Sequence, residues 1–164
     1  MVHVEPWGTG DLHLLQACLA DPVMMEHLGG PEPAEKIAER QARYERPGSR
    51  QYKAVDEATG EGAGWVGYWE RDWQGEPVFE IGWAVIPRFQ GRGIAGEATR
   101  QVIEIARAER ARRFLHAYPG VGNEPSNAVC RKLGFTFRGP HEFEYPAGSL
   151  MVCNDWRLDL FTDA

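Results

Sequence analysis

Cysteine is scarce in this sequence, and the few that occur lie far apart. Among 164 residues there are three, Cys18, Cys130 and Cys153, an odd number with no C-x-x-C pair. A disulfide framework needs an even set of cysteines, and a thiolate metal or redox site needs closely spaced ligands. We therefore expect three reduced thiols and no metal site built on cysteine.

The histidines also lack the spacing of a metal site. No H-E-x-x-H or similar ligand pattern is formed by the five of them, which are His3, His13, His27, His116 and His141. The sequence therefore predicts ordinary core and surface histidines and no metal.

Long hydrophobic runs and a basic surplus are missing as well. No apolar run approaches the about 18 to 20 residues of a membrane span, and Met1–Trp7 has no basic region followed by an apolar stretch. Lys and Arg number 18 against 24 Asp and Glu, which gives a formal net charge of −6. Nucleic acid and anionic membranes bind basic surfaces. These absences predict a cytoplasmic protein that binds neither membrane nor nucleic acid.

Arginine is nevertheless concentrated in one segment. Between Arg88 and Arg113 seven Arg stand against three Glu, a local charge of 7 − 3 = +4. A small polyanionic ligand would find a favourable charge there. The alternative is a solvated helix face on which Arg and Glu lie at i, i+4 spacing.

The length suits one domain over residues 1–164, with helices and antiparallel strands in its first half. Thr9 is the expected N-cap of a helix that carries Leu12, Leu15 and Leu19, and Pro33 introduces a second helix. Short, turn-rich connections favour antiparallel pairing of the strands that follow. The expected elements are a strand at Val2–Val4, a helix at Ala34–Tyr44, and strands at Gln51–Val55, Gly64–Glu70 and Val78–Ile86.

The second half has a strand-helix-strand pattern. A glycine-rich turn leads from the strand ending at Ile86 into a helix whose apolar stripe includes Ile94, Ala98 and Val102. A strand at Arg113–Tyr118 then completes a right-handed crossover with parallel strands. The remaining expected elements are a short helix at Ser126–Lys132 and an antiparallel pair at Phe135–Tyr145 and Leu150–Leu160, joined at Pro146-Ala147-Gly148.

The segment Gln90-Gly91-Arg92-Gly93-Ile94-Ala95-Gly96 is the most informative one. Glycines between a strand and a helix let backbone N–H groups approach a phosphate at the positive helix end. The segment also satisfies G-x-G-x-x-G, but a dinucleotide-binding unit needs the glycines directly after a strand and an acid at the end of the next strand. Here Pro87–Gln90 intervenes and Arg113–Tyr118 contains no acid, so the dinucleotide interpretation is rejected.

The same turn also reads as Gln90-x-x-Gly93-x-Ala95, followed by Asn123-x-x-Ser126 and Lys132-Leu133-Gly134-Phe135. In this order the motifs resemble the GNAT superfamily of N-acetyltransferases, and the later two are most similar to its Rim-type branch, which includes acetyltransferases of ribosomal-protein N-termini. The resemblance covers nearly the whole chain. It implies a single-domain α/β fold: a mixed sheet with antiparallel N-terminal strands, a parallel strand-helix-strand crossover at the cofactor site, and a C-terminal β-hairpin.

The resemblance also implies a site for acetyl-CoA. Gln90 begins the cofactor-binding motif. The diphosphate would be bound by the backbone amides of the residues that follow it, Gly91, Arg92, Gly93, Ile94, Ala95 and Gly96. The strand edge of Trp83, Ala84 and Val85 would pair with the pantetheine arm, and Asn123 would hydrogen-bond that arm. For Asn123 a helix cap is the alternative, and both roles are compatible.

Acetyl transfer to an amine needs a proton acceptor and a proton for the departing thiolate. Glu80 matches a position where some family members carry the base. The alternative for Glu80 is a solvent-facing carboxylate of the strand. Glu76, His116 and Tyr118 are substitute candidates for the base. Cys130 stands where the family commonly has a Tyr acid, and we expect it to be a small buried residue. Ser126 is then the expected donor to sulfur, its alternative being a helix N-cap.

The expected function is therefore acetyl-CoA-dependent transfer of an acetyl group to a primary amine, either a peptide N-terminus or a small amine. Trp73, placed in the turn Asp72–Gly75, would form an acceptor wall with Glu142 and Glu144. A non-catalytic acyl-CoA-binding or regulatory module is the alternative, and an NAD-binding oxidoreductase a remote one. A homodimer is left open.

Overall fold

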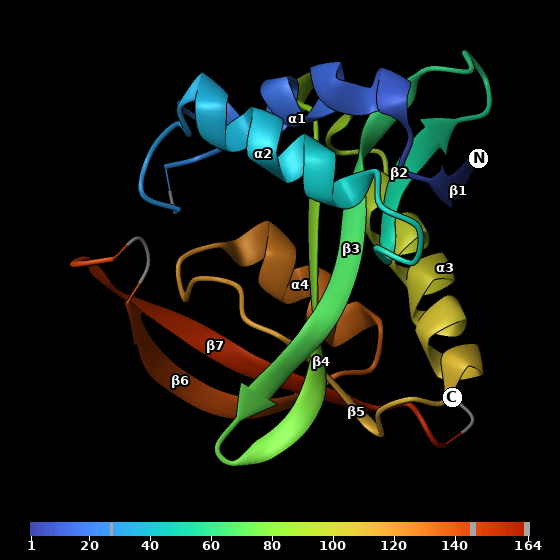
Figure 1. The fold of residues 1–164 in the computed structure, drawn as a ribbon. Coiled ribbons are helices and arrows are strands. Elements are labelled where there is room, and N and C mark those ends of the chain that lie inside the picture. Colours follow the sequence, from blue (N-terminus) through green and yellow to red (C-terminus); the bar gives the residue numbers. More distant parts are fainter. Residues whose placement is uncertain (27, 145–146, 163–164) are drawn as a thin grey trace. The chain divides into compact units, whose positions relative to one another are not determined.

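Seven strands are joined by hydrogen bonds in the order β1-β2-β3-β4-β5-β7-β6 (Figure 1). This computed structural model describes residues 1–26, 28–144 and 147–162. The strands are β1 (Val2–Pro6), β2 (Gln51–Asp56), β3 (Gly62–Trp73), β4 (Glu76–Val85), β5 (Phe114–Ala117), β6 (Thr136–Glu144) and β7 (Leu150–Asp159). The helices are α1 (Leu12–Leu19), α2 (Ala34–Tyr44), α3 (Ile94–Glu109) and α4 (Glu124–Lys132), with short 3-10 turns η1 (Thr9–Asp11) and η2 (Pro87–Phe89). None of the described helices is long and apolar enough to cross a membrane.

The chain forms two compact units. The first comprises Met1–Gly67 and Trp83–Val102, and the second comprises Tyr68–Gly82 and Ile103–Ala164. Three elements, β3, β4 and α3, contribute residues to both.

A hydrophobic core of the first unit is formed by α1, α2 and the residue that follows β1. Trp7, Leu14, Leu15, Ile37 and Tyr44 form one buried cluster. The rings of Trp7 and Tyr44 meet edge to face with centroids 5.8 Å apart, a favoured arrangement for an aromatic pair. The apolar stripes of α1 and α2 are thereby buried against each other.

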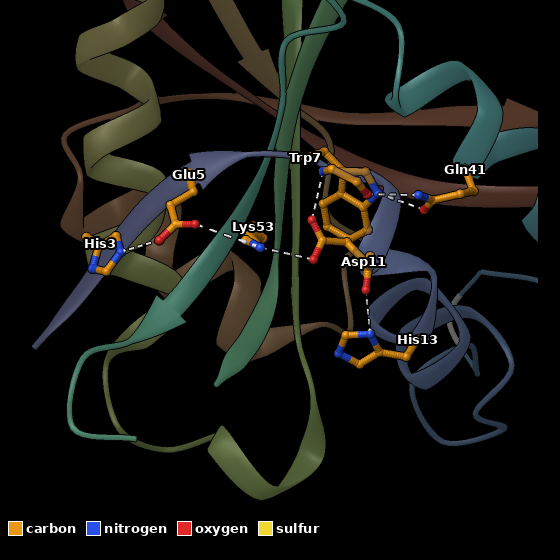
Figure 2. Close-up of polar contacts among 9 residues, drawn as sticks. His3, Glu5, Trp7, Asp11, His13, Gln41 and Lys53 are labelled. Atoms are coloured by element: carbon orange, nitrogen blue, oxygen red, sulfur yellow. Dashed lines mark hydrogen bonds and ion pairs between the residues drawn. The ribbon is translucent and has the colours of Figure 1, made fainter. Parts of the chain in front are cut away.

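A polar network fixes the start of α1 in the same unit (Figure 2). The Asp11 carboxylate accepts the backbone N–H of Gly8 at 2.7 Å and the Lys53 ammonium at 3.1 Å. Lys53 also lies 3.8 Å from the Glu5 carboxylate, which His3 contacts at 2.7 Å. Asp11 therefore connects β2 to the turn before α1. The side chain that accepts a backbone N–H at this end of the helix is that of Asp11, and not that of Thr9 as predicted.

In the second unit, β4 and β5 run parallel, and β5, β7 and β6 are antiparallel neighbours. One face of these strands is covered by helices: Asn127 of α4 accepts the indole N–H of Trp156 at 2.9 Å, and Glu109 of α3 accepts the Tyr68 hydroxyl at 2.7 Å. Phe79 and Leu115 are fully buried on this side. Because side chains alternate along a strand, Glu80 and His116 point to the other face.

The predicted fold class is confirmed: the sheet is mixed, the N-terminal strands are antiparallel, a parallel pair flanks a helical crossover, and β6 and β7 form a hairpin. The prediction of one domain stays a prediction. The predicted turn begins at Asp72, but β3 extends to Trp73. Arg71 pairs with Glu80 on the adjacent β4, and Trp73 donates to Asp155 on β7. Of the predicted strand end at Tyr145 and the turn from Pro146, residues 145–146 lie outside the described residues.

We expect Asp11→Ala to lower the free energy of unfolding by about 1 to 3 kcal/mol, because the partly buried N–H of Gly8 and the ammonium of Lys53 lose their acceptor. Urea unfolding at fixed pH measures this. Glu5→Gln is the control, since Glu5 is a half-exposed partner of the same lysine and its loss should leave the midpoint nearly unchanged. Equal midpoints for Asp11→Ala and the unmodified protein would contradict this role of Asp11.

Candidate active site

The predicted anion-binding turn lies in the first unit, between η2 and α3. Gly91 and Gly93 both have a φ of +76°, a backbone conformation that a side chain would strain. A Cβ added at either position would meet no heavy atom within 4 Å. Backbone conformation therefore requires glycine here, and the space beside the turn is open for a ligand.

The start of α3 presents free amides beside this turn. The first backbone bond at this end runs from the N–H of Glu97 to the carbonyl of Gly93, at 3.2 Å. The N–H groups of Ile94, Ala95 and Gly96 precede that bond and have no acceptor within the helix. They lie at the positive end of the helix dipole, which favours an anion.

Side chains attach the turn to the end of β4. The Gln90 amide donates to the Val85 carbonyl at 2.9 Å and contacts the Met24 sulfur at 3.2 Å. The predicted local charge is partly neutralised by a carboxylate outside the segment, because Arg88 pairs with Glu61 at 2.8 Å. Within the segment Arg100 pairs with Glu97 at 2.7 Å, which lowers the pKa of Glu97 to about 2. Arg92 lies over the Phe89 ring, and it makes no ion pair with the described residues. Arg92 is therefore the arginine of the turn whose charge is available to a ligand.

Glu80 lies in the second unit, on the face of β4 away from the helices. Its carboxylate pairs with the Arg71 guanidinium at 2.5 Å and also accepts a hydrogen bond from the Trp69 side chain. Burial raises the pKa of Glu80, while Arg71 and Trp69 act in the opposite direction. The alternative of a solvent-facing carboxylate is therefore wrong: Glu80 is largely buried and paired.

His116 and Asp155 lie on the same face, and both are buried. The His116 Nδ1 atom lies 2.6 Å from Asp155 Oδ1, and the Trp73 indole N–H donates to Asp155 Oδ2 at 3.2 Å. This contact links β3, β5 and β7. From the sequence, His116 was expected only as a substitute base and Trp73 only as part of a wall of the acceptor site. Asp155 was not predicted, because it lies 39 residues from His116 along the chain.

Aromatic rings surround Arg71 in this cluster. Its guanidinium lies about 5 Å from the ring centroids of Trp73, Tyr118 and Phe143, a geometry that attracts a cation. Burial raises the pKa of Tyr118, and its hydroxyl has no hydrogen-bond partner among the described residues. Arg71 is thus held both by Glu80 and by the rings, and sequence patterns did not reveal it.

The predicted acceptor wall of Trp73 with Glu142 and Glu144 is not observed. The Trp73 ring contacts His141 and Phe143, which alternate along β6 with the two glutamates. Neighbouring residues of a strand point to opposite faces, so Glu142 and Glu144 lie away from Trp73.

The other predicted residues of the second unit lie in α4 or directly before it. Asn123 is the N-cap, and its side chain accepts the backbone N–H of Ser126 at 3.3 Å. Ser126 therefore lies in the first turn of the helix, and the alternative that it is the cap is wrong. Cys130 is fully buried, which raises the pKa of its thiol to about 12 and makes it a poor nucleophile, as expected.

Residues 2–136 match the family described as the Acetyltransferase (GNAT) domain. The chain belongs to the GNAT acetyltransferase family. The parallel β4–β5 pair is present as the resemblance implies.

Two solved acetyltransferase structures and one curated relative illustrate the likeness. An uncharacterized N-acetyltransferase, YnaD of Bacillus subtilis (strain 168), is 32% identical over 82 residues, which are 50% of this chain and 45% of that protein. The chain thus matches about half the length of this relative. A putative acetyltransferase of Salmonella typhimurium, yncA with its cofactor acetyl-CoA, has a TM-score of 0.78, 17% identity and coverage of 100% and 96%. Spermidine N-acetyltransferase of Vibrio cholerae, in complex with CoA and spermine, has a TM-score of 0.79, 15% identity and coverage of 97% and 95%.

Metal chemistry finds no support in the described part of this GNAT chain. Among those residues no group of three or more His, Cys, Asp or Glu is arranged to hold a metal ion. The three cysteines are free thiols, and all are buried.

Gly93→Asp should weaken the binding of acetyl-CoA by at least about a hundredfold, because it places a carboxylate beside the free amides of α3. Gly60→Asp is the matched control: Gly60 has a φ of +75° and open space around it, and it lies in another turn of the same unit. Both variants carry the same backbone strain. Isothermal titration of the folded variants measures the two affinities, and equal affinities would refute the assignment of the turn.

Proposed function

We propose that this GNAT chain transfers the acetyl group of acetyl-CoA directly to a primary amine. The observation that carries the proposal is the glycine turn: two glycines at positive φ leave open space beside three free amides at the start of α3. A diphosphate fits such a site without any side chain, because backbone N–H groups and the helix dipole supply the attraction.

In this proposal the residues of the turn, 91–96, bind the diphosphate and Gln90 holds the turn against Val85. The backbone of Trp83, Ala84 and Val85 pairs with the pantetheine arm, and Asn123 bonds the same arm while capping α4. Acetyl-CoA supplies the activated acetyl thioester. The chain's residues orient it and handle the protons of the reaction.

The reaction needs a neutral amine, because only the nitrogen lone pair attacks the thioester carbon. An α-amino group has a reference pKa of about 8 and a lysine amine one of about 10.4, so a peptide N-terminus needs less help from a base. Glu80 is our proposed base. Ser126 is our proposed donor to the departing sulfur: its hydroxyl makes no hydrogen bond to the described residues, so it is available.

The acceptor in this proposal is a peptide N-terminus or a small amine. The motifs Asn123-x-x-Ser126 and Leu133-Gly134-Phe135 favour the Rim-type branch and hence a peptide. The polyamine named for the Vibrio cholerae structure supports a small cationic amine as the second choice.

Two measurements test the proposed function. Titration with acetyl-CoA and separately with NADH identifies the ligand, and amine-dependent release of free thiol over peptides, polyamines and aminoglycosides identifies the reaction. The buried cysteines of the protein contribute little to the thiol signal. Binding of acetyl-CoA with thiol release by a primary amine is the expected result. Binding without release would favour the non-catalytic module, and binding of NADH alone would favour the oxidoreductase.

Glu80→Gln should lower kcat/KM by about two to four orders of magnitude, and an amine of low pKa should recover part of that loss. A base works only when it is deprotonated, so activity should fall as pH falls through the pKa of Glu80, which burial moves to higher pH. Glu70→Gln is the matched control, because Glu70 pairs with Arg112 on the opposite face. Similar losses in the two variants would exclude Glu80 as the base.

Ser126→Ala should reduce kcat severalfold while the affinity for acetyl-CoA and the unfolding midpoint stay nearly unchanged. The physical reason is that the hydroxyl would assist only the departure of the thiolate, since the cap of α4 is provided by Asn123. Steady-state kinetics and thermal unfolding of the same preparation separate the two effects. An unchanged kcat would remove Ser126 from the mechanism.

A further inference from the structure

Two ionisable side chains are buried side by side in the second unit with no role assigned so far. Asp155 is 2% exposed and His116 is 3% exposed. Burying a carboxylate is costly unless it is paired and hydrogen-bonded. Here both carboxylate oxygens are used, one by the His116 ring and the other by the Trp73 indole.

The contact determines which nitrogen of His116 can accept a proton. Because a carboxylate only accepts hydrogen bonds, the 2.6 Å contact places a hydrogen on Nδ1. In the neutral ring the lone pair then lies on Nε2, and no hydrogen bond of Nε2 is found within the described part of the chain. Asp155 also stabilises the imidazolium that forms when Nε2 is protonated, as in other His–carboxylate pairs.

Glu80 is the neighbour of His116 on the adjacent strand. The two residues are register partners in the parallel pair of β4 and β5. Their side chains therefore lie beside each other on the face away from the helices. Burial raises the pKa of Glu80, and a charge on His116 is one of the influences that act to lower it.

An ammonium acceptor must lose two protons in each acetyl transfer. The first leaves before attack, when R–NH3+ becomes R–NH2. The second leaves when the C–N bond has formed and the nitrogen carries a positive charge. One carboxylate holds one proton at a time, so a base that is to take both must first pass the earlier one on.

We propose that Glu80 passes the first proton to Nε2 of His116, and that Asp155, held by Trp73, positions and stabilises the charged imidazole. This inference rests on the proposed function and deepens it, because it assigns acceptors that arrive as ammonium ions. His116 and Asp155 act through Glu80 and are positioning residues.

The proton balance closes without a further reactant. Glu80 takes a proton from R–NH3+ and gives it to His116, which becomes an imidazolium. The amine lone pair then forms the C–N bond, the C–S bond breaks, and Glu80 takes the second proton. Ser126 gives its proton to the departing CoA sulfur and is reprotonated, through water, by the proton on Glu80. The proton on His116 then returns through the emptied Glu80 to water after the product leaves.

Other ionisable groups lie on the same face as His116 and Asp155. By strand alternation they include Arg71, Glu76, Glu80, Tyr118, His141, Cys153, Asp155, Arg157 and Asp159.

The test compares two amines of similar size, one mostly protonated at the assay pH and one mostly neutral. His116→Asn keeps a donor toward Asp155 but has no basic nitrogen. It should lower kcat/KM for the protonated amine by about tenfold to a hundredfold and for the neutral amine by less than about twofold. His141→Asn, which removes a second histidine next to Trp73, should show no dependence on the amine.

Asp155→Asn provides a second variant, and it should give the same dependence on the amine because the imidazolium loses its counter-charge. A purely structural role would reduce stability and affect both amines equally. Equal fold-changes for the two amines in both variants, or wild-type kinetics in either folded variant, would overturn the inference.

The failure of this inference is distinguishable from failure of the proposed function. If the unmodified protein acetylates no amine, the proposed function is wrong. If the unmodified protein acetylates both amines and the variants do not discriminate between them, only the role of His116 and Asp155 is wrong.

Discussion

The proposed chemistry of the second unit depends on the hydrogen bonds of one buried carboxylate. Asp155 on β7 accepts from His116 on β5 and from Trp73 on β3, so three strands are fixed to one another through a single charged group. The carboxylate needs both donors because it is almost fully buried, and a buried charge is costly unless it is hydrogen-bonded. The same need fixes the ring of His116 and leaves its Nε2 atom as the basic one.

The two units of the chain contain different parts of the proposed chemistry. The first unit contains a turn of backbone amides that attracts phosphate through geometry and dipole, with little contribution from charged side chains. The second contains two carboxylates on one face of the sheet, Glu80 paired with Arg71 and Asp155 paired with His116, and the proposed proton transfers take place there. β4 contributes to both units, so Glu80 and the segment Trp83–Val85 belong to the same strand.

Local features of the chain were predictable, and contacts between distant residues were not. The helix Ala34–Tyr44 has the bounds that Pro33 indicates, and the glycine turn lies where the pattern Gln90-x-x-Gly93 places it. Polar residues near Asp72 suggested a turn because their partners on other strands cannot be read from sequence. The pairing of His116 with Asp155 is of the same kind: it arises only when β5 and β7 become neighbours.

Direct transfer is the central claim, and intact-mass spectrometry of the protein after a single turnover tests it most directly. The protein is mixed with isotopically labelled acetyl-CoA, first alone and then with an accepted primary amine, and the masses of protein and product are recorded. The account predicts that the protein gains no acetyl group in either case and that the label appears as an amide on the added amine. A labelled acetyl group on Cys130 or any other side chain that disappears when the amine is added would contradict it.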